Sequence, residues 1–165
     1  MPTSQKSLPS VCISLATPTD VLAAIPVINE AFAIVTFLGG TRTDETRITE
    51  MMAKGEFLVA KDDSGRIIAT VYSECNRERG YIGMLAVEPS LQGSGLGCKM
   101  MDAAAEHCRN LGCKHVDIKV LSRRSELLPF YRGLGYIETG TEEFHPGRPM
   151  KDGVECHCIV MSKFL

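Results

Sequence analysis

The stretch Gln92-Gly93-Ser94-Gly95-Leu96-Gly97 decides the fold of this 165-residue chain. It follows an apolar run at residues 81–87 and opens a helix-like stretch at residues 98–108. A strand, a glycine-rich turn and a helix in that order bring free backbone N–H groups and the positive end of a helix dipole to one point. Three glycines within five residues let the backbone approach an anion closely and adopt positive φ angles. The stretch therefore predicts a binding site for a phosphorylated cofactor.

Other phosphate-binding motifs fit this stretch less well. A P-loop NTPase places Lys-Ser or Lys-Thr directly after its last glycine, whereas Cys98 follows Gly97 here. A dinucleotide-binding fold spaces its glycines as Gly-x-Gly-x-x-Gly, and the glycines at 93, 95 and 97 lack the last interval. A glycine-rich turn without any function is the remaining alternative that the stretch alone leaves open.

The pattern Gln92-x-x-Gly95-x-Gly97 resembles the Gln/Arg-x-x-Gly-x-Gly/Ala signature of the GNAT superfamily of N-acetyltransferases. Two further phrases carry the resemblance. Leu85-Ala86-Val87-Glu88-Pro89 is similar to the hydrophobic-x-Val-x-Pro phrase that precedes the family's loop, and Phe130-Tyr131-Arg132-Gly133-Leu134-Gly135-Tyr136 is similar to its Phe-Tyr-x-x-x-Gly-Phe/Tyr phrase. The resemblance extends from about residue 11 to the C-terminus and is strong over residues 80–140.

The resemblance implies acetyl-CoA as a co-substrate, because the glycine loop of this family holds its pyrophosphate. It implies that N–H groups of residues 93–98 bind the pyrophosphate, and that backbone groups of residues 85–87 pair with the pantetheine arm and polarise the thioester carbonyl. Arg124 is a departure, since many members carry an asparagine seven residues before the tyrosine. The implied cofactor-binding residues are Leu85, Ala86, Val87, Gln92, Gly93, Ser94, Gly95, Leu96, Gly97, Cys98, Arg124 and Tyr131.

Two residues are the candidates for proton transfer. The resemblance implies that Tyr131 is the general acid that protonates the leaving thiolate, because a phenol with a pKa near 10 stays protonated at pH 7. Its alternative is a packed core residue, which is the interpretation favoured for Tyr136. Glu74, at the end of a predicted strand, is the candidate general base, directly or through a water molecule, although a solvated strand end is the alternative. Further base candidates are Glu88, His145 and His157.

Composition and length place limits on the function. The 165 residues are 44% hydrophobic and 23% charged, which is typical of one globular domain. A net charge of −2 argues against nonspecific nucleic-acid binding, and no apolar stretch approaches the roughly 20 residues that span a bilayer. We expect a flexible N-terminal tail at residues 1–10 without a secretory signal, a single acyl-CoA N-acyltransferase domain at residues 11–165, and a cytoplasmic location.

Cysteine usage indicates free thiols rather than a disulfide framework. Seven cysteines cannot all pair, and in a reducing compartment they act as small apolar residues. Cys156-His157-Cys158 suggests a metal site, but alternate residues of a strand point to opposite faces, and no Cys-x-x-Cys occurs. We therefore predict no metal.

The fold predicted from these patterns is α+β. It is a GNAT-like mixed, mostly antiparallel sheet with helices on both faces and one βαβ crossover, residues 81–121, that carries the cofactor loop. Thr19 or Asp20 is expected to cap the first helix, Pro26 to disturb it, and Gly55 to end the second helix in a left-handed conformation. Strands are predicted at residues 12–16, 57–60, 66–74, 81–87, 115–121, 136–139 and 155–161, and helices at 21–32, 44–54, 98–111 and 126–134.

The function predicted is transfer of an acetyl group from acetyl-CoA to a primary amine of a small molecule or peptide, by direct attack in a ternary complex. The alternatives are an acyl-CoA-binding regulatory module without turnover and an interaction domain that binds no cofactor. The acceptor is expected to contact residues 32–47 and 144–152, where Arg42 and Arg47 either hold a carboxylate or are surface arginines. An edge strand at the C-terminus is compatible with a homodimer.

Overall fold

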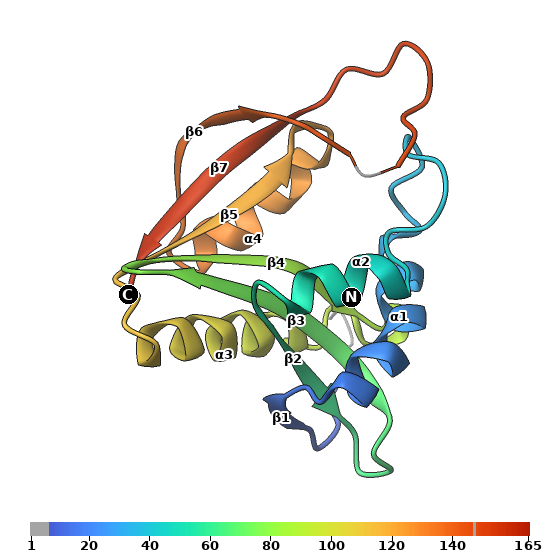
Figure 1. The fold of residues 1–165 in the computed structure, drawn as a ribbon, viewed down its shortest axis with the longest axis vertical. Helices are drawn as coiled ribbons and strands as arrows, with labels where there is room; N and C mark the ends of the chain where they lie inside the picture. Colours follow the sequence, from blue (N-terminus) through green and yellow to red (C-terminus); the bar gives the residue numbers. More distant parts are fainter. Residues whose placement is uncertain (1–6, 147) are drawn as a thin grey trace, which may run out of the picture.

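A seven-stranded sheet with helices on both faces forms the protein (Figure 1). The computed structural model describes residues 7–146 and 148–165. The strands are β1 (Cys12–Leu15), β2 (Glu56–Lys61), β3 (Ile67–Asn76), β4 (Arg79–Val87), β5 (His115–Leu121), β6 (Ile137–Glu143) and β7 (His157–Phe164). The helices are α1 (Pro18–Phe32), α2 (Glu45–Met52), α3 (Leu96–Asn110) and α4 (Leu128–Gly133), with the 3-10 turns η1 (Pro89–Leu91) and η2 (Ser122–Leu127).

The strand order is β1-β2-β3-β4-β5-β7-β6. The pair β4 and β5 is parallel, and every other neighbouring pair is antiparallel. Helix α3 connects the two parallel strands, as a parallel pair requires. The predicted fold, a mixed and mostly antiparallel sheet with one βαβ crossover, is therefore confirmed.

The two faces of the sheet carry separate apolar clusters. On one face α3 buries Leu96, Met100 and Ala104 against the strands, and side chains of α4 pack against the same cluster. On the other face α1 and α2 bury Val21, Ala24, Ile28 and Ile48 against Phe57, Val59 and Tyr72. Helices thus cover both faces, and a ligand that passes through the sheet would contact both clusters.

Strands β4 and β5 separate after a short paired segment. Their register joins only Arg79–Tyr81 of β4 with His115–Asp117 of β5, and Figure 1 shows the two strands diverging from there. Strand β4 also contains a bulge on its β3 side, where Met84 and Leu85 lie opposite Val71 and Met84 adopts a φ of 51°. The residue patterns predicted the crossover but not this fork between the two strands.

The helix starts differ in detail from the predicted ones. Thr17, rather than Thr19 or Asp20, caps α1: its side chain accepts a hydrogen bond from the Asp20 backbone N–H, and the Asp20 side chain bonds back to the Thr17 N–H. Pro26 lies inside α1 without ending it. Asp44 caps α2 through its bond to the Arg47 N–H, so this helix begins one residue later than predicted.

Two expectations are wrong. Gly55 does not adopt a positive φ; it is required because a Cβ there would overlap the Ser73 carbonyl oxygen and lie 2.6 Å from Tyr72 Oη. The C-terminal strand is not an edge, since β7 lies between β5 and β6, and β6 forms the edge. Residues 1–6 of the predicted tail lie outside the described residues, and Leu8 packs against the core.

Candidate active site

One large cavity, with a volume of about 860 Å³, passes through the fork between β4 and β5. On the α3 side its wall includes the glycine loop, the start of α3 and residues of α4. On the α1 and α2 side it includes the end of α1, the loop that follows it, and the segment between β6 and β7. The fork therefore joins two different surfaces in one continuous site.

The glycine loop has the conformation that an anion site needs. Gly93 and Gly95 have φ angles of 82° and 87°, which a residue with a Cβ rarely adopts. Gly95 is the N-cap of α3, and no side chain caps this helix end. The N–H groups of the first turn, Leu96–Cys98, have no acceptor within the helix by its geometry, so the loop presents donors at the positive end of the helix dipole.

Most of the predicted cofactor-binding residues line this cavity, and three do not. The residues in its wall are Leu85, Val87, Gln92, Gly93, Gly95, Gly97, Cys98, Arg124 and Tyr131. Ala86 and Leu96 are buried in the apolar clusters, and the Ser94 hydroxyl donates to the Leu91 carbonyl oxygen at 2.5 Å. These three can contribute backbone groups only. The Gln92 amide donates to the Val87 carbonyl oxygen at 3.3 Å and so fixes the loop to the end of β4.

Tyr131 lies in the cavity wall and Tyr136 does not. Burial raises the pKa of Tyr131, while the positive charge of Arg124 opposes that rise. Arg124 itself pairs with Glu126 at 2.6 Å. Tyr136 is a core residue, 2% exposed, and its ring packs edge-on against that of Tyr131 at 6.3 Å. The structure thus places the tyrosine of the family phrase where a ligand can contact it.

Glu74 lies beside the cavity rather than in its wall. Tyr72 Oη lies 2.9 Å from its carboxylate and 3.0 Å from the Met51 carbonyl oxygen, and these two acceptors share the single hydroxyl hydrogen. In the β3–β4 register Glu74 lies directly opposite Tyr81, which does line the cavity. Directly opposed residues share one face of a sheet. A path from Glu74 to the cavity therefore runs past the Tyr81 ring.

Sequence reasoning missed Tyr81, which stands where β4 and β5 separate. A Cβ on Gly83 would lie 2.5 Å from Tyr81 Oη, so the glycine makes room for this hydroxyl. The Lys119 ammonium lies 5.7 Å from the ring centroid. Burial raises the pKa of Tyr81, and the nearby charges of Lys119 and Arg42 oppose the rise. A tyrosine two residues before a glycine at the start of the strand is the one local signal for it.

Two loops that are distant in sequence close the other end of the cavity. The Gly39 N–H donates to the Pro149 carbonyl oxygen at 2.6 Å, and the Lys151 N–H donates to the Phe37 carbonyl oxygen at 3.0 Å. A bridge between Leu38 and Met150 lies between these bonds. The pairing brings Arg148 to the end where Arg42 and Arg47 lie. No local signal could have identified Arg148.

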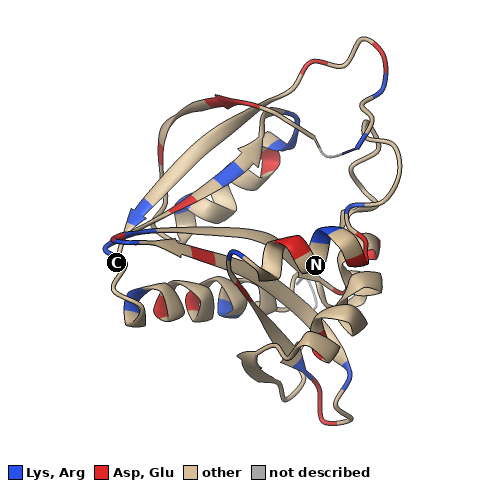
Figure 2. Ribbon diagram, viewed as in Figure 1, with Lys and Arg blue, Asp and Glu red and all other residues tan. Residues whose placement is uncertain are grey.

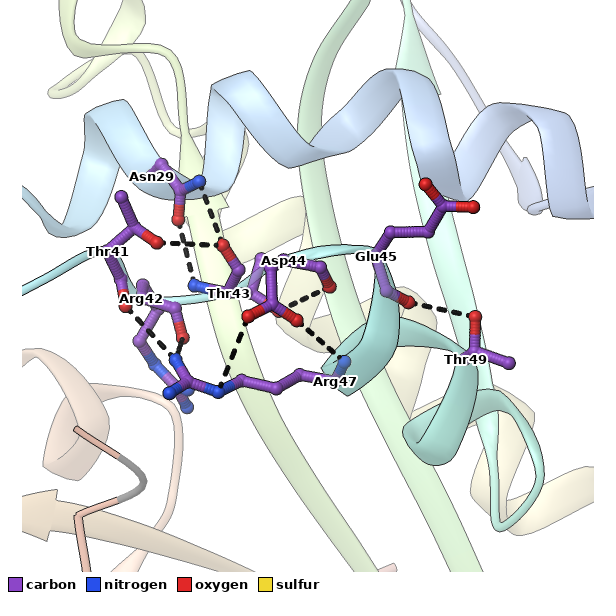
Figure 3. A network of polar contacts seen from close by, with 8 residues as sticks. All are labelled: Asn29, Thr41, Arg42, Thr43, Asp44, Glu45, Arg47 and Thr49. Atoms are coloured by element: carbon purple, nitrogen blue, oxygen red, sulfur yellow. Dashed lines mark hydrogen bonds and ion pairs between the residues drawn. The ribbon is translucent and has the colours of Figure 1, made fainter.

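Hydrogen bonds hold the segment that carries Arg42 (Figure 3). The Asn29 side chain on α1 bonds both the N–H and the carbonyl oxygen of Thr43, at 2.9 and 3.1 Å. Arg47 Nη1 donates to the carbonyl oxygens of Thr41 and Arg42, at 3.2 and 3.4 Å. The backbone at Arg42 is therefore fixed from two sides.

The described residues hold no group of three or more His, Cys, Asp or Glu side chains that could bind a metal ion. Each of the seven cysteines is a free thiol. Within the described ranges, no helix combines the length and the apolar character that a membrane span needs.

Comparisons with known proteins agree with this geometry. Residues 31–151 match the acetyltransferase (GNAT) domain family. A mycothiol acetyltransferase from Propionibacterium freudenreichii is 29% identical over 99 residues, 57% of this chain and 32% of that protein. N-alpha-acetyltransferase 30 from Saccharomyces cerevisiae is 36% identical over 61 residues, 37% of this chain and 35% of that protein. The chain therefore spans about a third of the length of these curated relatives.

Solved structures share the fold over most of the chain. The ribosomal-protein-S18-alanine N-acetyltransferase from Escherichia coli superposes with a TM-score of 0.78 at 18% identity, covering 94% of each chain. A Salmonella typhimurium protein, titled as an acetyltransferase with its cofactor acetyl-CoA, gives 0.73 at 19% identity, again covering 94% of each. Because the family match covers residues 31–151, well over half of the sequence, the chain belongs to the GNAT family of acetyltransferases.

Proposed function

We propose that this chain is an N-acetyltransferase that moves an acetyl group from acetyl-CoA to a primary amine by direct attack in a ternary complex. One observation carries the proposal: a single cavity runs through the β4–β5 fork, from the glycine loop at α3 to the arginine-bearing loops beside α1. A site open to both faces of the sheet can hold two substrates at once. Membership of the GNAT family supports the same reaction class.

The residues at the α3 end suit the cofactor. The N–H groups at Gly93 and Gly95 and those of the first turn of α3 would bind the pyrophosphate. Beyond Tyr81, the edge of β4 that faces β5 pairs with no strand among the described residues, so backbone groups of Leu85 and Val87 would pair with the amides of the pantetheine arm. Acetyl-CoA would supply the acetyl group in a form activated as a thioester.

Tyr131 is the proposed general acid. Its position in the cavity wall and a pKa raised by burial support this role, because a protonated phenol can donate to a thiolate at neutral pH. Glu74 is the proposed general base. Since Glu74 lies outside the cavity wall, opposite Tyr81 in the β3–β4 register, it would take the proton of the attacking ammonium group through a water molecule.

Two cysteines lie in the cavity wall: Cys98 is in the first turn of α3, at the end proposed for the pyrophosphate, and the burial of Cys158 argues against an acetyl group carried on its thiol. Cys158 is 6% exposed, and burial raises its pKa. A thiol that stays protonated at neutral pH is a poor nucleophile. Intact-mass measurement after incubation with acetyl-CoA alone tests direct attack, and a stoichiometric gain of one acetyl group on the protein would contradict it.

The experiment for the whole proposal is calorimetry with acetyl-CoA, followed by thiol release across amine classes in the same sample. Binding with thiol release for one class supports the enzyme. Binding without release from any amine supports the cofactor-sensing alternative, and no binding refutes both. The cytoplasmic location, the division at residue 11 and a homodimer stay predictions.

A further inference from the structure

Two arginines at the acceptor end of the cavity have no acidic partner. Arg42 and Arg148 both lie in the cavity wall. Among residues 7–146 and 148–165, no carboxylate lies within ion-pair distance of either guanidinium group. Both side chains are half-buried rather than extended into solvent. Removing a charged group from water costs free energy unless the group is paired, so two unpaired guanidinium groups in a cavity wall favour an anion as the ligand.

The geometry around Arg42 is fixed before any ligand binds. Its guanidinium carbon lies 5.3 Å from the centroid of the Phe32 ring at the end of α1. Its backbone is held by the bonds from Arg47, next to the Asn29–Thr43 pair (Figure 3). The hydrogen bonds between the two loops place Arg148 at the same end. Preorganised donors bind an anion with less loss of conformational entropy than mobile surface arginines.

The other charges in the cavity wall do not neutralise this pair. The wall contains five lysine and arginine side chains and two glutamates, although the whole chain has a net charge of −2. Glu142 pairs with Lys119 at 2.8 Å, and the Glu143 side chain, 83% exposed, lies 3.8 Å from His145. Figure 2 shows basic segments on both of the joined loops and at the start of α2, together with acidic segments on the loop between β6 and β7.

The lowered pKa values of Arg42 and Arg148 also favour an anion as the ligand. Burial lowers the pKa of Arg42, Tyr81 opposes this fall, and the positive charges of Arg148 and Arg47 add to it. Burial also lowers the pKa of Arg148. Cations that repel one another at short range are stabilised by an anion between them. A polycationic acceptor such as a polyamine would instead add to the repulsion.

We propose that the acceptor is a small amine that carries a carboxylate, an amino-acid-like molecule, and that Arg42 and Arg148 bind this carboxylate. The planar guanidinium fork matches a carboxylate in a bidentate arrangement. Binding there would leave the amine free to reach towards the fork between β4 and β5. Tyr81 lies at this fork, and the thioester of acetyl-CoA would lie there as well. This inference rests on the proposed N-acetyltransferase function.

The test compares each amine with a partner that lacks the negative charge. L-methionine and L-phenylalanine are each assayed beside their methyl esters, and L-glutamate beside its dimethyl ester. Spermidine serves as a cationic amine and a short peptide as an extended amine. Thiol release gives kcat/KM, and calorimetry in the presence of CoA gives acceptor binding. We expect the free acids to exceed their esters. Arg42→Gln and Arg148→Gln should each lower kcat/KM for the acids roughly 10- to 100-fold while changing the esters little.

Arg109→Gln is the matched control, because Arg109 is a 52%-exposed arginine near the C-terminal end of α3, outside the cavity wall. It should leave the acid-to-ester ratio unchanged. Calorimetry with acetyl-CoA distinguishes a failure of the carboxylate inference from a failure of the proposed function. If acetyl-CoA binds but turnover and binding show no preference for the free acids, or if the arginine variants affect acids and esters equally, the carboxylate inference is overturned alone. If acetyl-CoA does not bind, the proposed function fails as well.

Discussion

Two glycines of the cofactor loop, Gly95 and Gly97, should respond in opposite directions to the same substitution. Gly95 has a φ of 87°, and a Cβ there would meet no atom within 4 Å. The cost of Gly95→Ala is therefore backbone strain, about 1–2 kcal/mol for a left-handed residue. A smaller entropy of the unfolded chain offsets about 0.4–1 kcal/mol of that. We expect a net loss of about 1 kcal/mol, or a fall in Tm of roughly 2–4 °C for a chain of this size.

Gly97 lies in the first turn of α3 and does not have a positive φ. A Cβ there would lie 3.6 Å from Phe130 Cζ and 3.9 Å from Leu85 and Val87, which are ordinary contact distances. Alanine exceeds glycine in helix propensity by up to about 1 kcal/mol, so Gly97→Ala should raise the stability. The family signature also admits alanine at this position, so acetyl-CoA binding should persist.

Urea unfolding followed by circular dichroism measures the stability of both variants, and calorimetry measures the Kd for acetyl-CoA. Relief of strain at residue 95 would rotate the peptide planes whose N–H groups are proposed to bind the pyrophosphate. The loss of one such bond to a charged group weakens binding by about 1.5–3 kcal/mol, or roughly 10- to 100-fold. Equal destabilisation by both variants, or an unchanged Kd of Gly95→Ala for acetyl-CoA, would refute the proposal that this loop binds the pyrophosphate.

Tyr131→Phe should lower kcat at least roughly 10-fold with little change in the KM for acetyl-CoA. Because burial raises the pKa of this phenol above its ordinary value, its deprotonation should reduce the wild-type rate only in strongly alkaline solution. A wild-type rate that already falls through deprotonation of Tyr131 near neutral pH would contradict the assignment. Gly55→Ala should cost about 1–3 kcal/mol or more in unfolding free energy through its clash with β3, whereas Gly140→Ala, which meets no neighbour, should change the urea midpoint little. Gly83→Ala should displace the Tyr81 hydroxyl and raise the acceptor KM while the acetyl-CoA Kd stays constant; parallel changes in both would disprove a local effect.

Local sequence signals predicted the backbone of the glycine loop and of the elements that flank it well. The strand, turn and helix from residue 81 onward form one continuous segment, and β5 begins and ends at the predicted residues, His115–Leu121. A glycine pattern specifies its own backbone angles, so Gly93 and Gly95 could be assigned without tertiary information. The prediction for Gly55 was wrong because this glycine is required by a tertiary contact and not by its own backbone angles. Its requirement comes from Tyr72 and Ser73 on another strand, which a helix-ending pattern cannot indicate.

Tertiary contacts form the end of the cavity that is proposed to bind the acceptor. For this reason the sequence alone did not identify the residues of that end. Arg42 and Arg148 are more than a hundred positions apart, and backbone hydrogen bonds between their loops bring them to the same end of the cavity. Those bonds belong to neither apolar cluster of the sheet. The loops can therefore change in sequence without disturbing the fork or α3. A family that keeps its cofactor loop but varies these loops would retain one reaction and exchange acceptors. For this chain we therefore expect the identity of the acceptor to depend on side chains such as Arg42 and Arg148 more than on the motif that identifies the family.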